Sequence, residues 1–334
     1  MNNRTLLEIK NLQKDFVLAR RNLFGKPQIV RALEEINLEI QEGETIGIVG
    51  ESGSGKSTLG RAIVALEKFN QGAIVFESQD ISKLKNKVLR KSRPKFQMIF
   101  QDPYSSLNPR KSVGKILEAP LKIQKIGKSE RKKIILDLLS KVGLDENAYD
   151  KYPHEFSGGQ RQRIVIARAL ALKPKLIVAD EPVSALDVSI QAQVLNLLMQ
   201  MRKDFGLTLI FISHDLGVVR HISDRIAVIY LGNIVELAPA DELFESPKHP
   251  YTKALLSSIP RINTGKEDNN SQRIILSGEI PNPINRPSGC SFHTRCPIAK
   301  DICKVEKPLL RVINQESSNQ SEVACHLIQQ KGIL

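Results

Sequence analysis

The segment GESGSGKS, at residues 50–57, constrains the fold of this chain more than any other part of its sequence. It matches the pattern G-x-x-x-x-G-K-[ST] and lies between an apolar segment, ETIGIVG, and a helical one, TLGRAIVALE. Glycines let such a loop curl until successive N–H groups point at phosphate oxygens, and the following helix adds the positive end of its dipole. The segment therefore predicts a strand–loop–helix unit that binds the phosphates of a nucleotide.

Within this loop, two side chains have distinct expected roles. Lys56 is expected to reach the β- and γ-phosphates, and the Ser57 hydroxyl is expected to ligate Mg²⁺. A glycine-rich turn with an incidental Lys-Ser pair is the alternative, and it does not explain the strand before the loop and the helix after it. The predicted nucleotide contacts are Gly50, Glu51, Ser52, Gly53, Ser54, Gly55, Lys56, Ser57 and Thr58.

Apolar segments alternate with helical ones along the chain, which predicts an α/β domain with a largely parallel sheet. Three of the apolar segments end in polar residues: KFQMIFQ ends at Gln101, LIVADE at Asp180 and Glu181, and LIFISH at His214. Ligands of parallel α/β sheets bind outside the carboxyl ends of the strands, so we expect these side chains at the nucleotide. Asp180 is expected to hold Mg²⁺, and Glu181 to activate the attacking water as general base. Gln101 is expected to contact metal and water, and His214 to donate to the γ-phosphate.

A second glycine-marked helix start lies in FSGGQRQRIVIARAL, at residues 156–170. Ser157 is a favourable N-cap, and Gly158 and Gly159 leave the backbone bare at the start of the helix. The segment therefore predicts a second anion-binding site of the same kind as the phosphate loop. A capped helix that sends IVIARAL into the core is also expected, but it leaves the paired glycines unexplained.

Taken in order, GESGSGKS, FQDP, FSGGQ, LIVADEP, SALD and SHD resemble the nucleotide-binding subunit of ABC transporters over about residues 5–250. The resemblance implies a P-loop NTPase with a RecA-like parallel sheet core, an antiparallel β subdomain and a helical insertion at about residues 104–156. It also implies an ATPase that uses ATP and Mg²⁺ and pairs head-to-tail with a second subunit.

In such a pair, the resemblance assigns residues of the second glycine motif to the γ-phosphate of ATP on the partner's phosphate loop. These residues are Ser157, Gly158, Gly159 and Gln160. Asp187, the last residue of SALD, would cross the dimer interface. Phe16 is the candidate for stacking on adenine, and Phe24 is the alternative.

The C-terminal part of the chain narrows the resemblance. HPYTKALLSSIP, LSGEIPNPINRPSGCSFHTRCPIAKDIC and VACH resemble the C-terminal region of oligopeptide/dipeptide importer ATPases, and EPVSALDVSIQAQVLNLL is closer to their F-type than to their D-type subunit. The implied assembly has two ATPase subunits as a heterodimer, two membrane permeases and an extracytoplasmic peptide-binding protein. We therefore expect a nucleotide-binding domain at residues 1–259 and a small accessory segment at 260–334, at the cytoplasmic face of a bacterial membrane.

All four cysteines lie in that C-terminal segment, at Cys290, Cys296, Cys303 and Cys325. Their clustering indicates a shared site, and four thiolates suit either a tetrahedral zinc or an iron–sulfur cluster. The spacings are wider than those of most zinc modules and do not match ferredoxin motifs. The resemblance favours [4Fe–4S], with zinc or unliganded thiols as alternatives. His293 and His326 are close enough in sequence to replace or to support a ligand.

The net charge is +13, and much of the excess lies in KLKNKVLRKSRPK at residues 83–95 and KIQKIGKSERKK at 122–133. A solvated helix face is the simplest interpretation, with anionic lipid headgroups or nucleic acid as alternatives. Aromatic residues make up only 5% of the chain, and neither run contains one that could stack on bases, which argues against nucleic acid.

The hydropathy of the chain shows no sign of a membrane span or a secretory signal. No apolar run is long enough to span a bilayer, and the N-terminus lacks the apolar region of a secretory signal. The leading hypothesis is an ATPase that drives peptide import. The alternatives are a soluble ABC-type ATPase that acts on nucleic acid or the ribosome, and a redox or metal sensor regulated by ATP.

Overall fold

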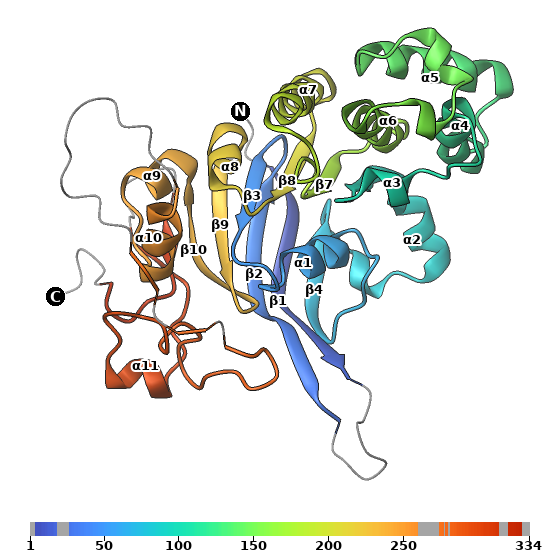
Figure 1. The fold of residues 1–334 in the computed structure, drawn as a ribbon. Coiled ribbons are helices and arrows are strands. Elements are labelled where there is room, and N and C mark those ends of the chain that lie inside the picture. The colour runs from blue at the N-terminus through green and yellow to red at the C-terminus, as the bar shows by residue number, and fades with distance from the viewer. Residues whose placement is uncertain are drawn as a thin grey trace, which may run out of the picture. The chain divides into compact units, whose positions relative to one another are not determined.

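The computed structural model describes residues 4–18, 27–259, 274–276, 278–279, 281–313 and 320–328. The chain divides into two compact units, each built from several stretches of sequence. The first unit contains Met1–Arg4, Gln41–Thr45 and Lys83–Ile212, and the second contains Thr5–Ile40, Ile46–Ser82 and Ser213–Leu334. In Figure 1 the colour follows the chain from blue at the N-terminus to red at the C-terminus.

The core of the first unit is a set of three parallel strands: β6 (Phe96–Ile99), β7 (Leu176–Asp180) and β8 (Thr208–Ile212). Every residue of β7 and β8 is buried, as expected for parallel strands that are covered on both faces. Because the three strands are parallel and in register, their carboxyl ends lie at one edge. The residues that follow β6 and β7 therefore emerge side by side.

Helices make up most of the remainder of this unit. Within the predicted helical insertion, α3, α4 and α5 contact one another or α6. The helix α7 (Val188–Phe205) is followed by Gly206, whose left-handed conformation terminates it. None of the residues of the basic helix α2 is buried. The helices are α2 (Asn86–Ser92), α3 (Pro103–Ser106), α4 (Val113–Ile123), α5 (Lys128–Lys141), α6 (Gly158–Leu170) and α7 (Val188–Phe205), with 3-10 turns at Ile81–Lys83, Arg93–Lys95, Glu146–Tyr149 and Pro153–Glu155.

The second unit contains two sheets. The first has the strand order β2-β1-β4-β5, and β4 pairs antiparallel with both β1 and β5. Apolar side chains alternate along β2, where Ile36, Leu38 and Ile40 are buried, which is typical of a sheet with one face in the core. The strands are β1 (Thr5–Val17), β2 (Ile29–Gln41), β4 (Gln71–Phe76) and β5 (Gln79–Asp80).

In the other sheet of the second unit, β3 (Thr45–Val49) pairs parallel with β9 (Arg225–Tyr230), and β9 pairs antiparallel with β10 (Asn233–Pro239). The C-terminal segment extends this sheet, because β12 (Glu322–Val323) pairs with β10 and β11 (Arg311–Val312) pairs with β12. The helices of this unit are α1 (Lys56–Ile63), α8 (Leu216–Ile222), α9 (Ala240–Glu245), α10 (Pro250–Ser257) and α11 (Asp301–Val305). Across both units, no helix that the structure describes combines the length and the hydropathy needed to cross a membrane.

Candidate functional site

The phosphate loop connects β3 to α1 in the second unit, as its sequence predicts. Gly53 and Gly55 have φ values of 76° and 104°, which glycine adopts without the steric cost of a Cβ. A Cβ on Gly50 would lie 2.1 Å from the Ile229 carbonyl oxygen, so only glycine allows the loop to approach β9 this closely. Lys56 is buried, and its Nζ donates to the carbonyl oxygens of Gly50 and Glu51, both at 2.8 Å. The loop is therefore folded around the lysine that is expected to contact phosphate.

Other predicted contacts of the second unit lie close to this loop in sequence or structure. Ser57 and Thr58 occupy the first turn of α1. The backbone N–H of Ser213 donates to the Ile48 carbonyl at 3.2 Å, which places the adjacent, exposed His214 beside the strand that leads into the loop. Phe16, near the end of β1, is partly buried, and Lys14 Nζ lies 4.4 Å from its ring centroid. Phe24, the alternative for the adenine, lies outside the described residues.

In the first unit, the structure brings together two side chains that sequence places 80 positions apart. Gln101 follows β6, Glu181 follows β7, and Gln101 Nε2 donates to Glu181 Oε2 at 3.0 Å. Glu181 has a left-handed φ of 48°, and its N–H donates to the Ile212 carbonyl at 2.9 Å. Such a conformation is uncommon for a residue other than glycine and is concentrated at functional sites. Asp180, at the end of β7, is buried. This edge therefore presents a carboxylate that is held by a hydrogen bond from an amide, and a carboxylate is one of the groups that can act as a general base.

The second glycine motif forms the start of α6 in the first unit. Ser157 is the N-cap: its hydroxyl accepts from the Gln160 N–H at 3.3 Å, and Gln160 Oε1 accepts from the Ser157 N–H at 3.0 Å. The two glycines differ in their surroundings. A Cβ on Gly159 would lie 2.4 Å from Ile190 Cγ2 of α7, whereas a Cβ on Gly158 would meet Leu186 Cδ2 at 3.4 Å, an ordinary contact. Internal packing therefore explains Gly159 but not Gly158.

Asp187, the last residue of SALD, is the N-cap of α7. Its Oδ1 accepts from the Ile190 N–H at 3.0 Å and from the Ser189 hydroxyl at 2.9 Å. The hydrogen bond from the Ile190 N–H, followed by that from Ser189, holds the pKa of Asp187 below its ordinary value. Since α7 begins here and Leu186 lies beside Gly158, SALD and the second glycine motif are neighbours in the first unit.

The structure corrects the prediction for the cysteines. Among the residues that the structure describes, no group of three or more His, Cys, Asp or Glu side chains is placed to hold a metal ion, so the [4Fe–4S] prediction and the zinc alternative are wrong. All four cysteines are free. Burial raises the pKa of Cys290 to about 11 and also raises those of Cys296 and Cys325.

The histidines near the cysteines are engaged elsewhere. His293 Nδ1 lies 2.9 Å from the Cys290 carbonyl oxygen, and His326 Nε2 lies 2.9 Å from the Glu306 carbonyl oxygen. Both rings therefore contact backbone carbonyls. The clustering of cysteines instead reflects a small packed segment, in which the Cys290 N–H donates to the Cys303 carbonyl at 2.8 Å.

Sequence reasoning missed two residues that touch the phosphate loop. The Tyr251 hydroxyl accepts from the Glu51 N–H, and the Arg295 guanidinium pairs with the Glu51 carboxylate. They lie 200 and 244 positions along the chain from Glu51. No periodicity or local spacing connects positions so far apart, so no signal in a single sequence would have found them.

Behind these contacts lies a buried aromatic cluster that includes His249, the N-cap of α10. His249 Nδ1 accepts from the Tyr251 N–H at 3.1 Å, and the His249 N–H donates to Glu236 Oε2 at 2.9 Å. Burial lowers the pKa of His249 to about 3, so the ring is neutral in the folded protein.

We expect the free energy of unfolding to decrease as the pH falls below about 6.5, the ordinary pKa of histidine. Between that value and pH 3, the unfolded chain binds a proton at His249 that the folded chain does not, so acid favours unfolding by up to ~1.4 kcal/mol per pH unit. His249→Asn keeps a capping acceptor and removes this titration. Urea unfolding at pH 7 and 5.5 should therefore show a smaller loss of stability in the variant.

Glu236 acts in the opposite direction in both proteins. Burial raises the pKa of Glu236 in the folded protein, so the stability that the protonated carboxyl contributes is lost as the pH rises through this raised pKa. It cancels in the comparison between the two proteins. Equal losses in wild type and His249→Asn would contradict the assignment to His249.

Two family models match this chain. The model described as "ABC transporter" matches residues 33–184, and the model described as "Oligopeptide/dipeptide transporter, C-terminal region" matches residues 235–303. The first match includes the phosphate loop, Gln101 and Glu181, and the second includes Tyr251 and Arg295.

Similar proteins match the chain over almost its whole length. The oligopeptide transport ATP-binding protein AppF of Bacillus subtilis is 51% identical, over 98% of each chain. The oligopeptide transport ATP-binding protein OppF of Salmonella typhimurium is 48% identical, over 96% of each chain. The dipeptide transport ATP-binding protein DppF of Haemophilus influenzae is 46% identical, over 97% of each chain.

Two solved structures share the fold over much of the chain. The ATP-binding cassette MJ0796, in a dimeric post-hydrolysis state bound to ADP and Pi, is 31% identical with a TM-score of 0.62, and the match covers 70% of this chain and 99% of that one. The structure of cbiO1 from Clostridium perfringens, part of the ABC transporter complex cbiONQ, is 29% identical with a TM-score of 0.63. The match covers 72% of this chain and 91% of that one.

Proposed function

Because this chain belongs to the ABC transporter family, as an ATP-binding protein of the oligopeptide/dipeptide type, we propose that it hydrolyses ATP to drive the import of oligopeptides or dipeptides through partner permeases. The contact between Gln101 and Glu181 carries the catalytic part of this proposal. It holds a carboxylate in place at the end of a buried strand, where a general base for water is needed.

Family membership decides between the alternatives that the sequence left open. The predicted fold class, an ABC-type cassette with an antiparallel β subdomain, is confirmed. ATP hydrolysis is the activity of this family of peptide-transport proteins. The alternative of an ATPase that acts on nucleic acid or the ribosome has no support, because the relatives described above are transport proteins. A metal sensor has none either, because the described cysteines form no metal site.

Each predicted residue has a role that suits its chemistry. The phosphate loop binds the ATP phosphates through its N–H groups and Lys56, and Phe16 stacks on adenine. Glu181 takes the proton of the attacking water, Gln101 orients that water, and His214 donates to the γ-phosphate.

The donor atoms fit Mg²⁺, which takes oxygen ligands. Ser57 supplies a hydroxyl oxygen in the second unit, and Asp180 and Gln101 supply carboxylate and amide oxygens in the first. When bound, Mg²⁺ neutralises charge on the β- and γ-phosphates. Ser57, Asp180 and Gln101 would hold the ion, and Glu181 remains the group that takes the proton.

The assembly proposed for this subunit has a second ATPase subunit as a heterodimeric partner, two permeases and an extracytoplasmic binding protein. Ser157, Gly158, Gly159 and Gln160 contact the γ-phosphate on the partner's loop, and Asp187 lies at that interface. Residues 1–259 form the nucleotide-binding domain, and residues 260–334 form the accessory segment. The subunit is peripheral, at the cytoplasmic face of the membrane.

Purification from membranes tests this proposal. The protein is tagged at its N-terminus, the membranes are solubilised in a mild detergent, and the proteins that co-purify are identified by mass spectrometry, with the tag alone as control. We expect two polytopic permeases and a second ATPase subunit. Recovery from the soluble fraction with ribosomal proteins or nucleic acid would contradict the proposal.

A further inference from the structure

Glu51, the second residue of the phosphate loop, is held by the C-terminal part of the chain. Arg295 Nη1 donates to Glu51 Oε2 at 2.8 Å and to Oε1 at 3.2 Å, and Arg295 Nη2 donates to Oε1 at 3.2 Å. The Glu51 N–H donates to the Tyr251 hydroxyl at 2.9 Å, and its carbonyl accepts from Lys56 Nζ at 2.8 Å. Every polar group of Glu51 therefore has a partner, and two of these partners come from beyond residue 250.

The pair between Arg295 and Glu51 is shielded from water. The Arg295 side chain is only 8% exposed and that of Glu51 is 23% exposed. Tyr230, Tyr251 and Phe292 are buried and pack on one another with ring centroids 4.7 to 5.4 Å apart. A forked arginine–carboxylate pair in such surroundings fixes both partners in one geometry. Removal of one partner would leave the other charge poorly compensated.

The phosphate loop is rich in glycine and exposed in its middle, so contacts from outside the loop can stabilise its conformation. Gly50, Gly53 and Gly55 allow the curled backbone, but glycine also has the most conformational freedom to lose on folding. Ser52 and Gly53 are exposed, so little packing restrains the middle of the loop. A contact from outside that holds the loop in its folded conformation reduces the entropy lost when a ligand binds, and so strengthens binding.

We propose that Arg295 is a positioning residue for the nucleotide site, which acts through Glu51 to hold the phosphate loop in its phosphate-binding conformation. This inference rests on the proposed function in one respect, that the loop binds ATP. The segment between Cys290 and Cys296 then has a role that needs no metal: it presents Arg295 to the loop. The C-terminal region thereby contributes to the affinity for ATP without touching the nucleotide.

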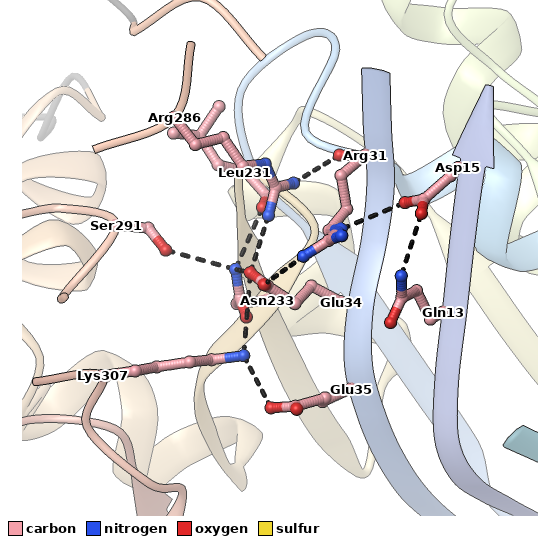
Figure 2. A network of polar contacts seen from close by, with 10 residues as sticks. All are labelled: Gln13, Asp15, Arg31, Glu34, Glu35, Leu231, Asn233, Arg286, Ser291 and Lys307. Carbon is pink, nitrogen blue, oxygen red and sulfur yellow. Dashed lines mark hydrogen bonds and ion pairs between the residues drawn. The ribbon is translucent and has the colours of Figure 1, made fainter. Parts of the chain in front are cut away.

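A second arginine of the C-terminal region, Arg286, provides a control (Figure 2). Arg286 Nη1 donates to Glu34 Oε2 at 2.8 Å, and Arg286 Nη2 donates to the Arg31 carbonyl, so Arg286 bonds to β2 rather than to the loop. Lys307 and Asn233 also converge on Glu34. The Arg286 side chain is 15% exposed, close to the value for Arg295, so truncation of either arginine removes a largely buried ion pair.

The experiment measures the Kd of a fluorescent ATP analogue with Mg²⁺ for the purified full-length protein, together with Tm. Arg295→Met should weaken binding about tenfold through lost pre-organisation, whereas Arg286→Met should change Kd less than about twofold. Glu34 keeps its contacts with Arg31, Lys307 and Asn233 when Arg286 is removed, and Tm shows that both variants are folded. In a Glu51→Gln background, Arg295→Met should have little further effect on Kd, because Arg295 acts through Glu51. Arg295→Lys keeps the charge but loses the paired hydrogen bonds, and it should weaken binding several-fold.

Either of two results would overturn the inference. An unchanged Kd in Arg295→Met shows that the pair does not support the loop, and an equal loss in Arg286→Met shows a general structural effect. If Arg295→Met does not fold, Arg295→Lys with an unchanged Kd has the same meaning. Failure of the wild-type protein to bind the analogue is a different result, which contradicts the proposed function itself.

Discussion

Glu181→Gln is expected to reduce ATP turnover by at least about a hundredfold while ATP binding is retained. An amide has the size of the carboxylate but cannot take the proton of the attacking water. The Gln101 Nε2 contact, 3.0 Å in the structure, can be kept by the amide oxygen of the new residue. The left-handed backbone at this position is that of a non-glycine residue already, so the substitution adds no backbone change. Phosphate release and retained nucleotide are measured on the same sample.

A matched change on the same unit separates catalysis from general effects of charge. Glu146 is exposed in a 3-10 turn of the first unit, and Glu146→Gln removes one carboxylate there as well. This control should hydrolyse ATP at the wild-type rate. Turnover within about threefold of wild type in Glu181→Gln would remove Glu181 from the role of general base, since loss of such a group costs far more.

The parts of the site that sequence predicted are those set by local rules. The phosphate loop follows from a motif between a strand and a helix, and the approach of Gln101 to Glu181 follows from parallel strands that end at one edge. Arg295 and Tyr251 could not be predicted, because their contacts with Glu51 depend on how distant segments pack. The prediction of a metal site at the cysteines was wrong for a related reason. The spacing of cysteines along the chain does not show whether the thiols are buried or how they are oriented.

The paired glycines are an instructive case between these extremes. Sequence reasoning treated Gly158 and Gly159 as one anion-binding feature. The structure gives Gly159 a packing role against Ile190 of α7, where a Cβ would lie 2.4 Å from Cγ2. Gly158 has no such constraint, since its φ is not positive and a Cβ there makes an ordinary contact. The two positions can therefore be separated by mutation.

Gly159→Ala is expected to destabilise the first unit by about 1–3 kcal/mol, because the new methyl group overpacks the contact between α6 and α7. Gly158→Ala should leave stability nearly unchanged. Urea unfolding of both variants measures the difference. A larger loss of stability in Gly158→Ala than in Gly159→Ala would contradict the packing argument.

Gly158→Asp is expected to reduce ATP turnover by about a hundredfold or more without unfolding the protein. An aspartate at the first position of α6 interacts favourably with the helix dipole, so the helix itself should gain stability. The same charge would repel the γ-phosphate that the proposed partner subunit presents to this helix start. Binding of ATP to the protein's own phosphate loop should be unaffected, because the role proposed for this helix start is on the nucleotide of the partner subunit.

The combination of two substitutions tests whether this helix start acts between subunits. Glu181→Gln should trap ATP and hold the paired subunits together. Association of this variant with the second ATPase subunit is measured by light scattering, with and without ATP. Adding Gly158→Asp should abolish that ATP-dependent association, while Gly158→Ala should weaken it far less. Association that survives Gly158→Asp would mean that the helix start does not contact the partner's nucleotide, and Gly158 would then have neither a packing role nor a role in anion binding.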